Sequence, residues 1–255
     1  MPALDGSRIR VPGAEVRVVE RCGSTNAVLL EELPARPVLL AADAQTAGRG
    51  QRGRRWHSAP GAGATFTVMR RLDCEPRRLA GLSLAVGVAV ARALRGLGAA
   101  GVELKWPNDL LAEGAKLGGI LVQTRIQGGA AWVAAGIGIN CRPVGRLGER
   151  LRRKVASLDG LVRPPLAREA VIEAVAREVF AALGTYERDG LAAFAGDWRA
   201  MHAHEGRRLR VRFPDGRTLS GVAEGVAPSG ALRLRTRGGV REVADGRIVG
   251  AGSSA

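Results

Sequence analysis

Two apolar stretches, Lys116-Leu-Gly-Gly-Ile-Leu121 and Gly136-Ile-Gly-Ile-Asn140, have the composition of β-strands but carry two glycines each. Glycine weakens a strand, because it has no side chain to pack and loses more backbone entropy on folding than other residues. Two explanations are open: a β-bulge, or a wall where a flat ligand lies directly against the backbone. Lys116 begins the first strand and Asn140 ends the second, so each also carries a polar group.

Upstream of them, Lys105-Trp106-Pro107-Asn108-Asp109 ends a strand-like run in a turn that proline fixes. The turn presents an amide and a carboxylate next to each other. Such a pair can hydrogen-bond a base or a ribose, or hold a magnesium ion through its oxygens. The alternative is an Asx turn, in which Asn108 or Asp109 bonds only its own backbone.

Further upstream, residues 45–63 form a polar loop that is too long and too charged for a hairpin turn. Its centre, Gly48-Arg-Gly-Gln-Arg-Gly-Arg-Arg-Trp56, combines glycines, which let a backbone approach a ligand, with arginines, which match phosphate oxygens. The run contains G-x-G-x-x-G, but a dinucleotide-binding fold needs a helix next, and the segment up to Pro60 has no helical pattern. The sequence also lacks a Walker phosphate loop. The alternative to phosphate binding is a flexible basic surface loop.

Hydrophobic periodicity around these motifs predicts an α+β domain. Alternating or continuous apolar runs mark strands, and apolar residues at three- and four-residue steps mark helices that pack on a core. The strand at 64–69 alternates small polar and apolar residues, as a half-buried strand does. The start of the chain reads as irregular, and Ser24 is placed to cap a short helix. The expected strands are 37–42, 64–69, 102–106, 117–124 and 131–139, and the expected long helices are 79–94 and 168–186.

The hydrophobic pattern of the sequence changes near residue 206. From there on, RRLRVRF, TLSGVAEGV, ALRLRTR and VREVADG are short alternating segments, separated by PDG, APSG and GG turns. This pattern is typical of a small antiparallel barrel of about fifty residues. We therefore expect two domains, residues 1–203 and 204–255.

The charge balance of the chain raises the question of a nucleic-acid partner. Its 255 residues include 39 Lys+Arg and 24 Asp+Glu, which give a formal net charge of +15, and basic surfaces bind phosphate backbones. Only Lys105, Lys116 and Lys154 are lysines, however. A composition rich in arginine, alanine and glycine is also what a GC-biased codon pool produces, so solvated surface arginine is the simpler interpretation.

Composition also excludes several other classes of protein. Three cysteines and three histidines without a CxxC pair argue against a disulfide framework and a structural zinc site. Signal-peptide and membrane-spanning segments are not evident, which predicts a cytoplasmic protein without a membrane partner.

Five motifs, STN, ADAQTAGRGQRGRRWHS, LKWPNDLL, KLGGIL and GIGIN, stand in an order and spacing that closely resemble the biotin protein ligases, the biotin–acetyl-CoA-carboxylase ligase family. All three asparagines and two of the three lysines of the chain lie in these motifs. The stretch GLSLAVGVAVA and the terminal barrel are also similar to that family. The resemblance implies a mixed sheet with helices on one face, like the catalytic domain of class II aminoacyl-tRNA synthetases, followed by an SH3-like barrel.

The resemblance further implies a ligase that works in two steps. The carboxylate of biotin attacks the α-phosphate of ATP to give biotinyl-5′-AMP and pyrophosphate, and a lysine of a carrier domain then attacks the acyl-adenylate and releases AMP. Biotin and ATP would be substrates, Mg²⁺ an activator, and the acceptor a biotin carboxyl carrier domain of acetyl-CoA carboxylase or a related carboxylase. Because a carboxylate and a polyphosphate repel each other, fixed cations and backbone amides suit this chemistry.

By the same resemblance, Lys116 would bridge the biotin carboxylate and the α-phosphate, and Arg49 would act with it in catalysis. The residues implied in biotin binding are Ser24, Thr25, Asn26, Gln45, Gly48, Arg49, Lys116, Gly119, Gly136 and Gly138. Those implied in binding ATP or the adenylate are Gln51, Arg52, Arg54, Arg55, Trp56, Asn108, Asp109, Lys116 and Asn140. No residue is assigned as a metal ligand, although Asp109 and Asn140 are candidate neighbours of Mg²⁺.

The chain departs from the family in two places. The family loop usually reads G-R-G-R, whereas Gln51 stands here at the second arginine; this predicts looser retention of biotinyl-AMP unless Arg52 or Arg54 compensates. Bifunctional members carry a DNA-binding domain ahead of the catalytic domain, and the residues before Ser24 are too few for one. The chain is therefore expected to be monofunctional and not to bind a specific DNA sequence. A homodimer through edge strands near Leu121 or Val133 is a further expectation.

Two other functions stay open. A lipoate–protein ligase would share the architecture and the adenylation chemistry, although GRGxRGR together with KWPND favours biotin. A noncatalytic nucleic-acid-binding protein is the rival from another class, since small barrels bind oligonucleotides, but only Phe213 offers an aromatic stacking surface in the barrel segment. His57 reads as a loop residue rather than a general base, and Cys22 and Cys141 read as buried thiols.

Overall fold

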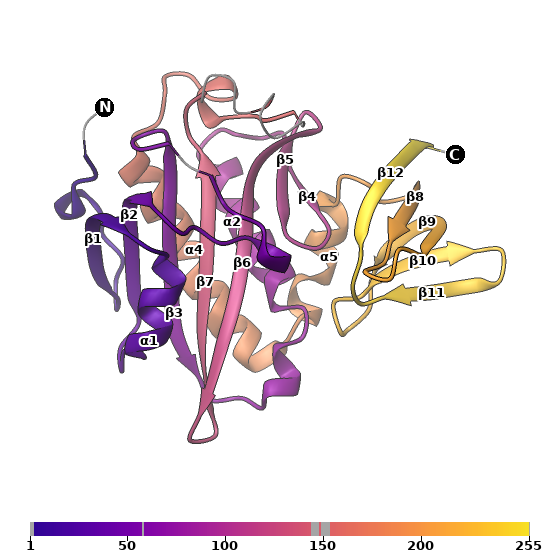
Figure 1. Ribbon diagram of the computed structural model, residues 1–255, viewed down its shortest axis with the longest axis horizontal. Coiled ribbons are helices and arrows are strands. Elements are labelled where there is room, and N and C mark those ends of the chain that lie inside the picture. Colours follow the sequence, from indigo (N-terminus) through magenta and orange to yellow (C-terminus); the bar gives the residue numbers. More distant parts are fainter. Residues whose placement is uncertain (1–2, 58, 144–147, 149–153, 255) are drawn as a thin grey trace.

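Seven strands form a mixed sheet in the part of the chain that the computed structural model describes, residues 3–57, 59–143, 148 and 154–254 (Figure 1). They lie in the order β1-β2-β3-β7-β6-β5-β4, with β1 and β2 parallel and every other pair antiparallel. Their bounds are β1 Glu15–Cys22, β2 Val38–Gln45, β3 Gly63–Leu72, β4 Val102–Lys105, β5 Asp109–Ala112, β6 Ala115–Gln127 and β7 Ala130–Asn140.

Strand β1 contradicts the expectation of an irregular start. It pairs with β2 from Glu15 to Cys22 and lies at the edge of the sheet, where each of its side chains is exposed or only half-buried. An edge strand tolerates charges on both faces, so EVRVVERC lacks the apolar pattern that marks an inner strand. Strand β3 differs in the opposite sense, because it is buried from Gly63 to Met69 rather than half-buried.

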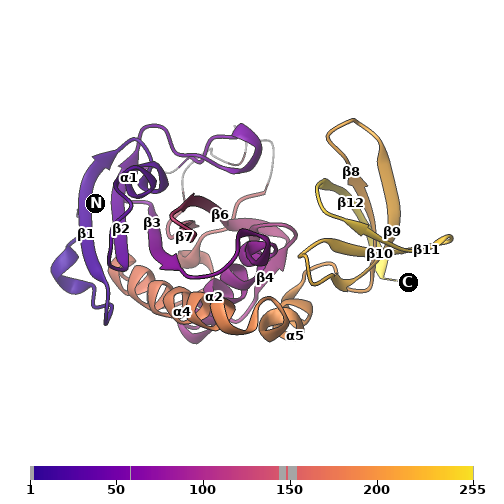
Figure 2. The ribbon, with the colours of Figure 1, turned by 90° about the horizontal axis from the view of Figure 1, so that it is seen from below.

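Helices cover both faces of the sheet, and not one face as expected (Figure 2). The helices are α1 Thr25–Glu32, α2 Leu82–Gly96, α4 Arg168–Asp189 and α5 Ala192–Met201. Helices α2, α4 and α5 cover one face, and the short α1 lies on the other, where Leu29 packs with Val38, Leu40 and Met69. Successive side chains of β2 and β3 point alternately into two hydrophobic cores, one on each face of the sheet. This arrangement explains why β3 is buried on both faces.

One predicted helix begins later than expected, and another helix has no counterpart among the predictions. Leu79 does not begin α2; it ends a short 3₁₀ turn, Pro76–Leu79, and α2 begins at Leu82 after Gly81, whose φ of 83° breaks the helix. Helix α5 follows α4 after Gly190. Because Phe194 and Trp198 are its only buried residues, its sequence has no clear apolar periodicity that would predict a helix.

A second, five-stranded antiparallel sheet follows, in the order β11-β10-β9-β8-β12 within the described residues. The strands are β8 Arg207–Arg212, β9 Thr218–Val226, β10 Leu232–Thr236, β11 Gly239–Val243 and β12 Arg247–Ser254. Strands β8 to β11 correspond to the four alternating segments of the sequence. Strand β12 is additional: its glycine-rich sequence RIVGAGSS has little strand character, and pairing with β8 holds it in place.

The two sheets meet at the end of α5 and around the turn before β10. Ala203 N donates to Leu104 O at 2.9 Å, and Trp106 Nε1 donates to Gly230 O at 3.1 Å. Gly230 lies so close to Gly81 that a Cβ at position 230 would stand 2.5 Å from Gly81 Cα. The small β domain is thus packed directly on the large sheet and its helices through backbone contacts that larger residues would block.

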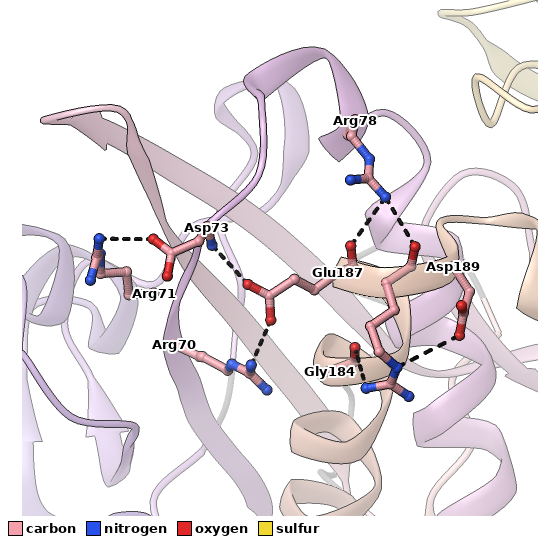
Figure 3. Close-up of polar contacts among 8 residues, drawn as sticks. Arg70, Arg71, Asp73, Arg78, Gly184, Glu187 and Asp189 are labelled. Carbon is pink, nitrogen blue, oxygen red and sulfur yellow. Dashed lines mark hydrogen bonds and ion pairs between the residues drawn. The ribbon is translucent and has the colours of Figure 1, made fainter.

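Several arginines form hydrogen bonds and ion pairs that connect separate elements of the fold (Figure 3). Glu187 at the end of α4 accepts from Arg70 Nη2 at 2.6 Å and from the backbone N of Asp73 at 2.7 Å. Arg78 donates to the carbonyls of Glu187 and Arg188, both at 3.1 Å, where the negative end of the α4 dipole favours a cation. Part of the +15 charge is therefore structural.

The strand positions bear on two earlier expectations. Val133 does not lie at a sheet edge, because β7 pairs with β3 on one side and β6 on the other. Leu121 lies beyond the end of the β5 pairing, so from here to Gln127 no strand of the described chain covers the outer side of β6. Among the same residues, we find no helix with the length and apolar character that crossing a membrane requires.

A buried histidine, His202, and a half-buried one, His204, lie at the junction of the two sheets. The His202 ring stacks on Trp198 with centroids 4.3 Å apart and meets His204 edge-on at 5.7 Å, and His202 Nδ1 lies 3.5 Å from a Glu205 carboxylate oxygen. Burial lowers the pKa of His202, and burial with the neighbouring His202 lowers the pKa of His204 to about 4. The folded state thus disfavours the charged form of both rings.

This junction predicts a loss of stability in acid. Because the folded pKa of His204 lies below the ordinary 6.5, its contribution is complete above pH 6.5 and is lost as the pH falls toward 4. We expect a decrease of about 1–2 kcal/mol in unfolding free energy between pH 7.5 and 5 from this residue. Urea unfolding at both pH values measures it: His204→Gln should reduce the difference, and the loop variant His57→Gln should not. An unchanged difference in His204→Gln would contradict the assignment.

Candidate active site

A cavity of about 390 Å³ opens on the α1 face of the large sheet, between β2, β3, β6, β7 and the loop that follows β2. This volume lies within the range of small-molecule sites. Of the residues that the sequence implicates, all but Gly48, Arg52 and Asn140 line it. The structure therefore gathers five separated motifs around one space; Ser58, the last residue of the loop motif, lies outside the described residues.

The floor of the cavity is a patch of backbone without side chains. Gly138 of β7 pairs with Gly119 of β6 on one side and with Thr65 of β3 on the other, and Gly136 pairs with Leu121 and with Thr67 in the next row. The glycines stand in register within β-ladders, as a ligand wall requires. On the β5 side of β6 the register shifts between Lys116 and Gly118, so the β-bulge, the first of the two explanations, lies next to this flat surface, and the ligand wall stays a prediction.

A network of polar side chains closes one end of the floor. Thr67 Oγ1 donates to Asn26 Oδ1 at 2.6 Å and lies within hydrogen-bond distance of Thr25 Oγ1, at 2.7 Å. Asn26 Nδ2 donates to Leu121 O at 3.0 Å and to Gln123 Oε1 at 2.9 Å. Asn26 is 3% exposed, and both ends of its amide bind protein atoms, so it holds α1 on the sheet.

The capping of α1 differs from the prediction. Ser24 occupies the N-cap position but makes no side-chain capping bond. The amide of Thr25 instead donates to Gln45 Oε1 at 2.7 Å, and the hydroxyl of Thr25 lies 3.1 Å from the same oxygen. A β2 side chain thus replaces the local cap and fixes the carboxamide of Gln45 at the cavity edge.

Residues 46–62 form the long connection between β2 and β3 that the sequence predicts, and inside it residues 48–56 fold into a short arginine hairpin with an isolated β-bridge between Arg49 and Arg55. Gly50 N donates to Arg54 O at 2.6 Å, and Trp56 N donates to Gly48 O at 3.0 Å. Gly53, with φ 70°, lets the chain reverse at the tip. At the base, a Cβ on Gly48 would stand 2.9 Å from Trp56 O, so Gly48 shapes the hairpin instead of lining the cavity.

Trp56 lies on the glycine floor. A Cβ at Gly138 would stand 2.4 Å from Trp56 Cε2, and one at Gly119 would stand 3.6 Å from Cζ3. Trp56 Nε1 is buried without a hydrogen-bond partner among the described residues. The indole packs on the glycines, but burying its N–H group without a hydrogen bond costs free energy. A ligand that takes the place of the ring on the glycines would remove this cost.

Lys116 places a half-buried cation beside the floor. Its Nζ forms an ion pair with Asp109, and the two side chains are 15% and 26% exposed. The same nitrogen lies 5.9 Å from the centroid of Trp56. Asn140 does not reach the cavity; its Nδ2 donates to the carbonyls of Lys116 at 3.3 Å and Ala156 at 3.1 Å, and so supports the backbone that carries the lysine.

The Asn108 side chain does not form an Asx turn. Its Nδ2 donates to Ile120 O at 2.7 Å. Ile120 N donates to the backbone carbonyl of Asn108 at 3.0 Å, which extends the hydrogen-bond ladder between β5 and β6 beyond the end of β5. Asp109 is the one acidic side chain among the described residues that line the cavity. Within the same ranges, no three His, Cys, Asp or Glu side chains gather into a metal cluster.

Several cavity residues escaped the sequence reasoning. Arg247 of β12 lines the cavity although it lies in the barrel, and no spacing argument links it to the motifs. Thr65 lines it too, and with Thr67 it is buried at alternate positions of β3, so two hydroxyls on one face of an inner strand were a readable signal. His57 also lines the cavity. Burial raises the pKa of Cys141 to about 12, which leaves it a thiol, whereas Cys22 is only half-buried.

Sequence comparison places these features in a family. The profile of the Biotin/lipoate A/B protein ligase family matches residues 18–140, and that of the Biotin protein ligase C terminal domain matches residues 204–249. The Bifunctional ligase/repressor BirA of Escherichia coli (strain K12) is 34% identical over 247 residues, which cover 94% of this chain and 75% of that protein. The chain belongs to the biotin protein ligase family.

Further relatives agree with this membership. The Biotin--[acetyl-CoA-carboxylase] ligase of Mycobacterium tuberculosis (strain ATCC 25618 / H37Rv) is 34% identical to this ligase over 243 residues, which cover 92% of this chain and 88% of that one. The biotin protein ligase from Aquifex aeolicus, solved in complex with biotin and ATP, has a TM-score of 0.78, is 24% identical, and matches over 92% of this chain and 97% of its own. That likeness confirms the predicted fold, a mixed sheet with helices followed by a small β domain.

Proposed function

We propose that this ligase attaches biotin to a carrier domain in two steps. A carboxylate oxygen of biotin attacks the α-phosphorus of ATP, the bond to the β-phosphate oxygen breaks, and pyrophosphate leaves. An acceptor lysine then attacks the acyl carbon of biotinyl-5′-AMP, an amide forms as the amine loses its proton to solvent, and AMP leaves. The observation that carries the proposal is the place of Lys116, between the glycine floor and the arginine hairpin.

In this scheme Lys116 supplies a fixed positive charge where two anions must meet. A carboxylate and a triphosphate repel each other, and a half-buried ammonium held by its own strand stabilises both without reorganising. The Asp109 carboxylate holds the ammonium until the ligand takes its place. Arg49, Arg54 and Arg55 line the same cavity and can bind phosphate oxygens, which supports this cavity as the place where the polyphosphate is held.

The glycine floor and the polar end suit the rings of biotin. The floor at Gly119, Gly136 and Gly138 accepts a flat ring against the backbone, and Ser24, Thr25 and Gln45 offer polar atoms for the ureido group. Asn26 supports this surface rather than binding the ligand, because its amide is used by protein atoms. Trp56 must leave the floor for the ring, and it can then cover the adenylate from above.

Mg²⁺ fits the cavity as a companion of the nucleotide. The ion is commonly bound by one or two carboxylates together with substrate phosphates, and Asp109 is a carboxylate that lines the cavity, whereas Asn140 is engaged elsewhere. When bound there, Mg²⁺ would neutralise phosphate charge. The biotin carboxyl carrier domain as acceptor, a cytoplasmic location where ATP is available, a homodimer and the lack of specific DNA binding are further parts of the proposal.

Biotin-dependent exchange between ATP and labelled pyrophosphate tests the first step, and transfer of labelled biotin to a purified carrier domain tests the second. We expect exchange with biotin and none with lipoate. The match of residues 204–249 to the Biotin protein ligase C terminal domain supports biotin over lipoate. Exchange with lipoate alone would favour the lipoate ligase, and no exchange together with tight binding of DNA or RNA would favour the nucleic-acid rival.

Gln51, which lines the cavity at the tip of the hairpin, predicts loose retention of the adenylate. An arginine at this position would add a charge-assisted hydrogen bond to a phosphate. We expect Gln51→Arg to lower the release of free biotinyl-AMP by about 3- to 10-fold, as bonds to charged groups permit. Filtration and chromatography of the released adenylate measure it, with Gln51→Met as a control that adds no donor. Equal release from wild type and Gln51→Arg would remove the idea.

A further inference from the structure

The tip of the arginine hairpin is attached to the barrel and not to the ligand cavity. Arg52 Nη2 donates to a carboxylate oxygen of Asp245 and to Gly246 O, the latter at 2.6 Å. Arg52 itself has φ 57° and ψ 43°, the left-handed conformation, which costs a non-glycine residue energy. A contact from a distant segment holds the hairpin in this shape.

The barrel segment that receives Arg52 is itself fixed in place. Asp245 and Gly246 join β11 to β12, and a Cβ on Gly246 would stand 2.5 Å from Val211 Cγ1 of β8. The next residue, Arg247, lines the ligand cavity. The connection from β11 to β12 thus leads directly to a cavity residue and is in contact with the tip of the hairpin.

We propose that Asp245 is a positioning residue that acts through Arg52: the pair latches the hairpin to the barrel and keeps the loop over the bound adenylate. Residues 204–254 thereby control how long biotinyl-AMP stays bound. Residues Arg49, Gln51, Arg54 and Trp56 of the same hairpin line the cavity, so release of its tip from the barrel moves groups that face the ligand. The functional part of this inference rests on the proposed ligase reaction, whereas the latch is a property of the structure alone.

The strength of the latch sets the expected effect. The side chains of Arg52 and Asp245 are 36% and 59% exposed, and exposed ion pairs are weak and sensitive to salt. The bond to the carbonyl of Gly246 survives when only the Asp245 carboxylate is removed. Asp245→Asn should therefore raise adenylate release by about 3-fold, and Asp245→Lys, which places a like charge next to Arg52, by about 10-fold. High salt should shrink both effects.

Two readouts test the latch. The first is the release rate of biotinyl-AMP, and the second is the rate of trypsin cleavage after the hairpin arginines, followed by mass spectrometry, which needs no catalysis. Asp215→Lys is the matched control, because Asp215 is an exposed barrel aspartate whose ion pair with Arg217 lies away from the hairpin. We expect Asp245→Lys to raise both rates, Asp215→Lys to change neither, and circular dichroism to show that both variants are folded.

A charge exchange separates the latch from direct ligand binding by Arg52. If Arg52 acts through Asp245, Arg52→Glu should loosen the hairpin, and the double variant Arg52→Glu/Asp245→Lys should return to within about 3-fold of wild type. If the double variant stays as open as Arg52→Glu, or if Asp245→Lys behaves like wild type in both readouts, the latch is wrong. Failure of the wild type to form biotinyl-AMP would instead overturn the proposed function, and the trypsin readout would still decide the latch.

Discussion

Replacing Lys116 by alanine is expected to lower the rate of biotinyl-AMP formation by about 100- to 1,000-fold. Removal of one preorganised charge or donor at a developing anion has an effect of this size. The loss should fall on kcat of the pyrophosphate exchange more than on the KM for biotin, because the floor and the polar end of the cavity stay intact. The ion pair with Asp109 also disappears, and since Asp109 is 26% exposed, water can solvate the remaining carboxylate.

Lys154→Ala is the matched control. Lys154 lies on the neighbouring segment, where Lys116 N donates to its backbone carbonyl at 3.0 Å. This variant removes a lysine of the same region but keeps that bond, so exchange should stay near the wild-type rate. Equal rates for Lys116→Ala and wild type would contradict the mechanism. Affinity for nonspecific DNA should not change in either variant, which distinguishes the ligase from a nucleic-acid binder.

The sequence predicts the parts of this molecule in which local pattern and long-range packing agree. The strands around Gly119 and Gly138 are apolar and continuous, and α4 shows clear helical periodicity, so both are found at their predicted places. Strand β1 fails this test, because at the sheet edge its charged residues need no burial. Position in the fold, and not the intrinsic preference of β1, makes it a strand.

The site shows the same division. The motifs of Lys116 and Asn108 lie next to the ends of strands, so predicting the strands from the sequence also predicts where these two residues lie. The roles of Asn140, Arg52 and Arg247 depend on contacts between segments far apart in the chain, such as the bond from Arg52 to Gly246, which joins positions 194 residues apart. No periodicity encodes such a contact, so these roles require the structure.

Gly136→Ala is expected to be the most damaging small substitution in the cavity floor. A Cβ at this position would stand 2.4 Å from Oδ1 and 3.0 Å from Cγ of Asn26. Asn26 cannot easily give way, because Thr67, Leu121 and Gln123 hold its amide at 2.6–3.0 Å. The added methyl group therefore breaks buried hydrogen bonds or displaces α1, and the unfolding free energy should fall by about 2–4 kcal/mol.

The same change should weaken biotin binding. Thr67 also contacts Thr25, and Thr25 orients Gln45, so displacement of Asn26 spreads to the polar end of the site. We expect the Kd for biotin to rise by about 10- to 100-fold, since a shift near 1 Å in a binding group has effects of this order. Isothermal titration calorimetry and urea unfolding measure the two effects. Gly196→Ala is the control: it lies in α5 with nothing within 4 Å of its Cβ and should stabilise the fold slightly.

A double variant then tells overpacking apart from loss of the polar network. Asn26→Ala removes the atoms that the new methyl group meets, so Asn26→Ala/Gly136→Ala should be more stable than the sum of the two single effects predicts. Biotin affinity should not recover with stability, because the link from Asn26 to Thr67 is absent in the double variant. If affinity returned together with stability, the floor would bind biotin by shape alone, and the network of Asn26, Thr67 and Thr25 would have no part in orienting Gln45 toward the ligand.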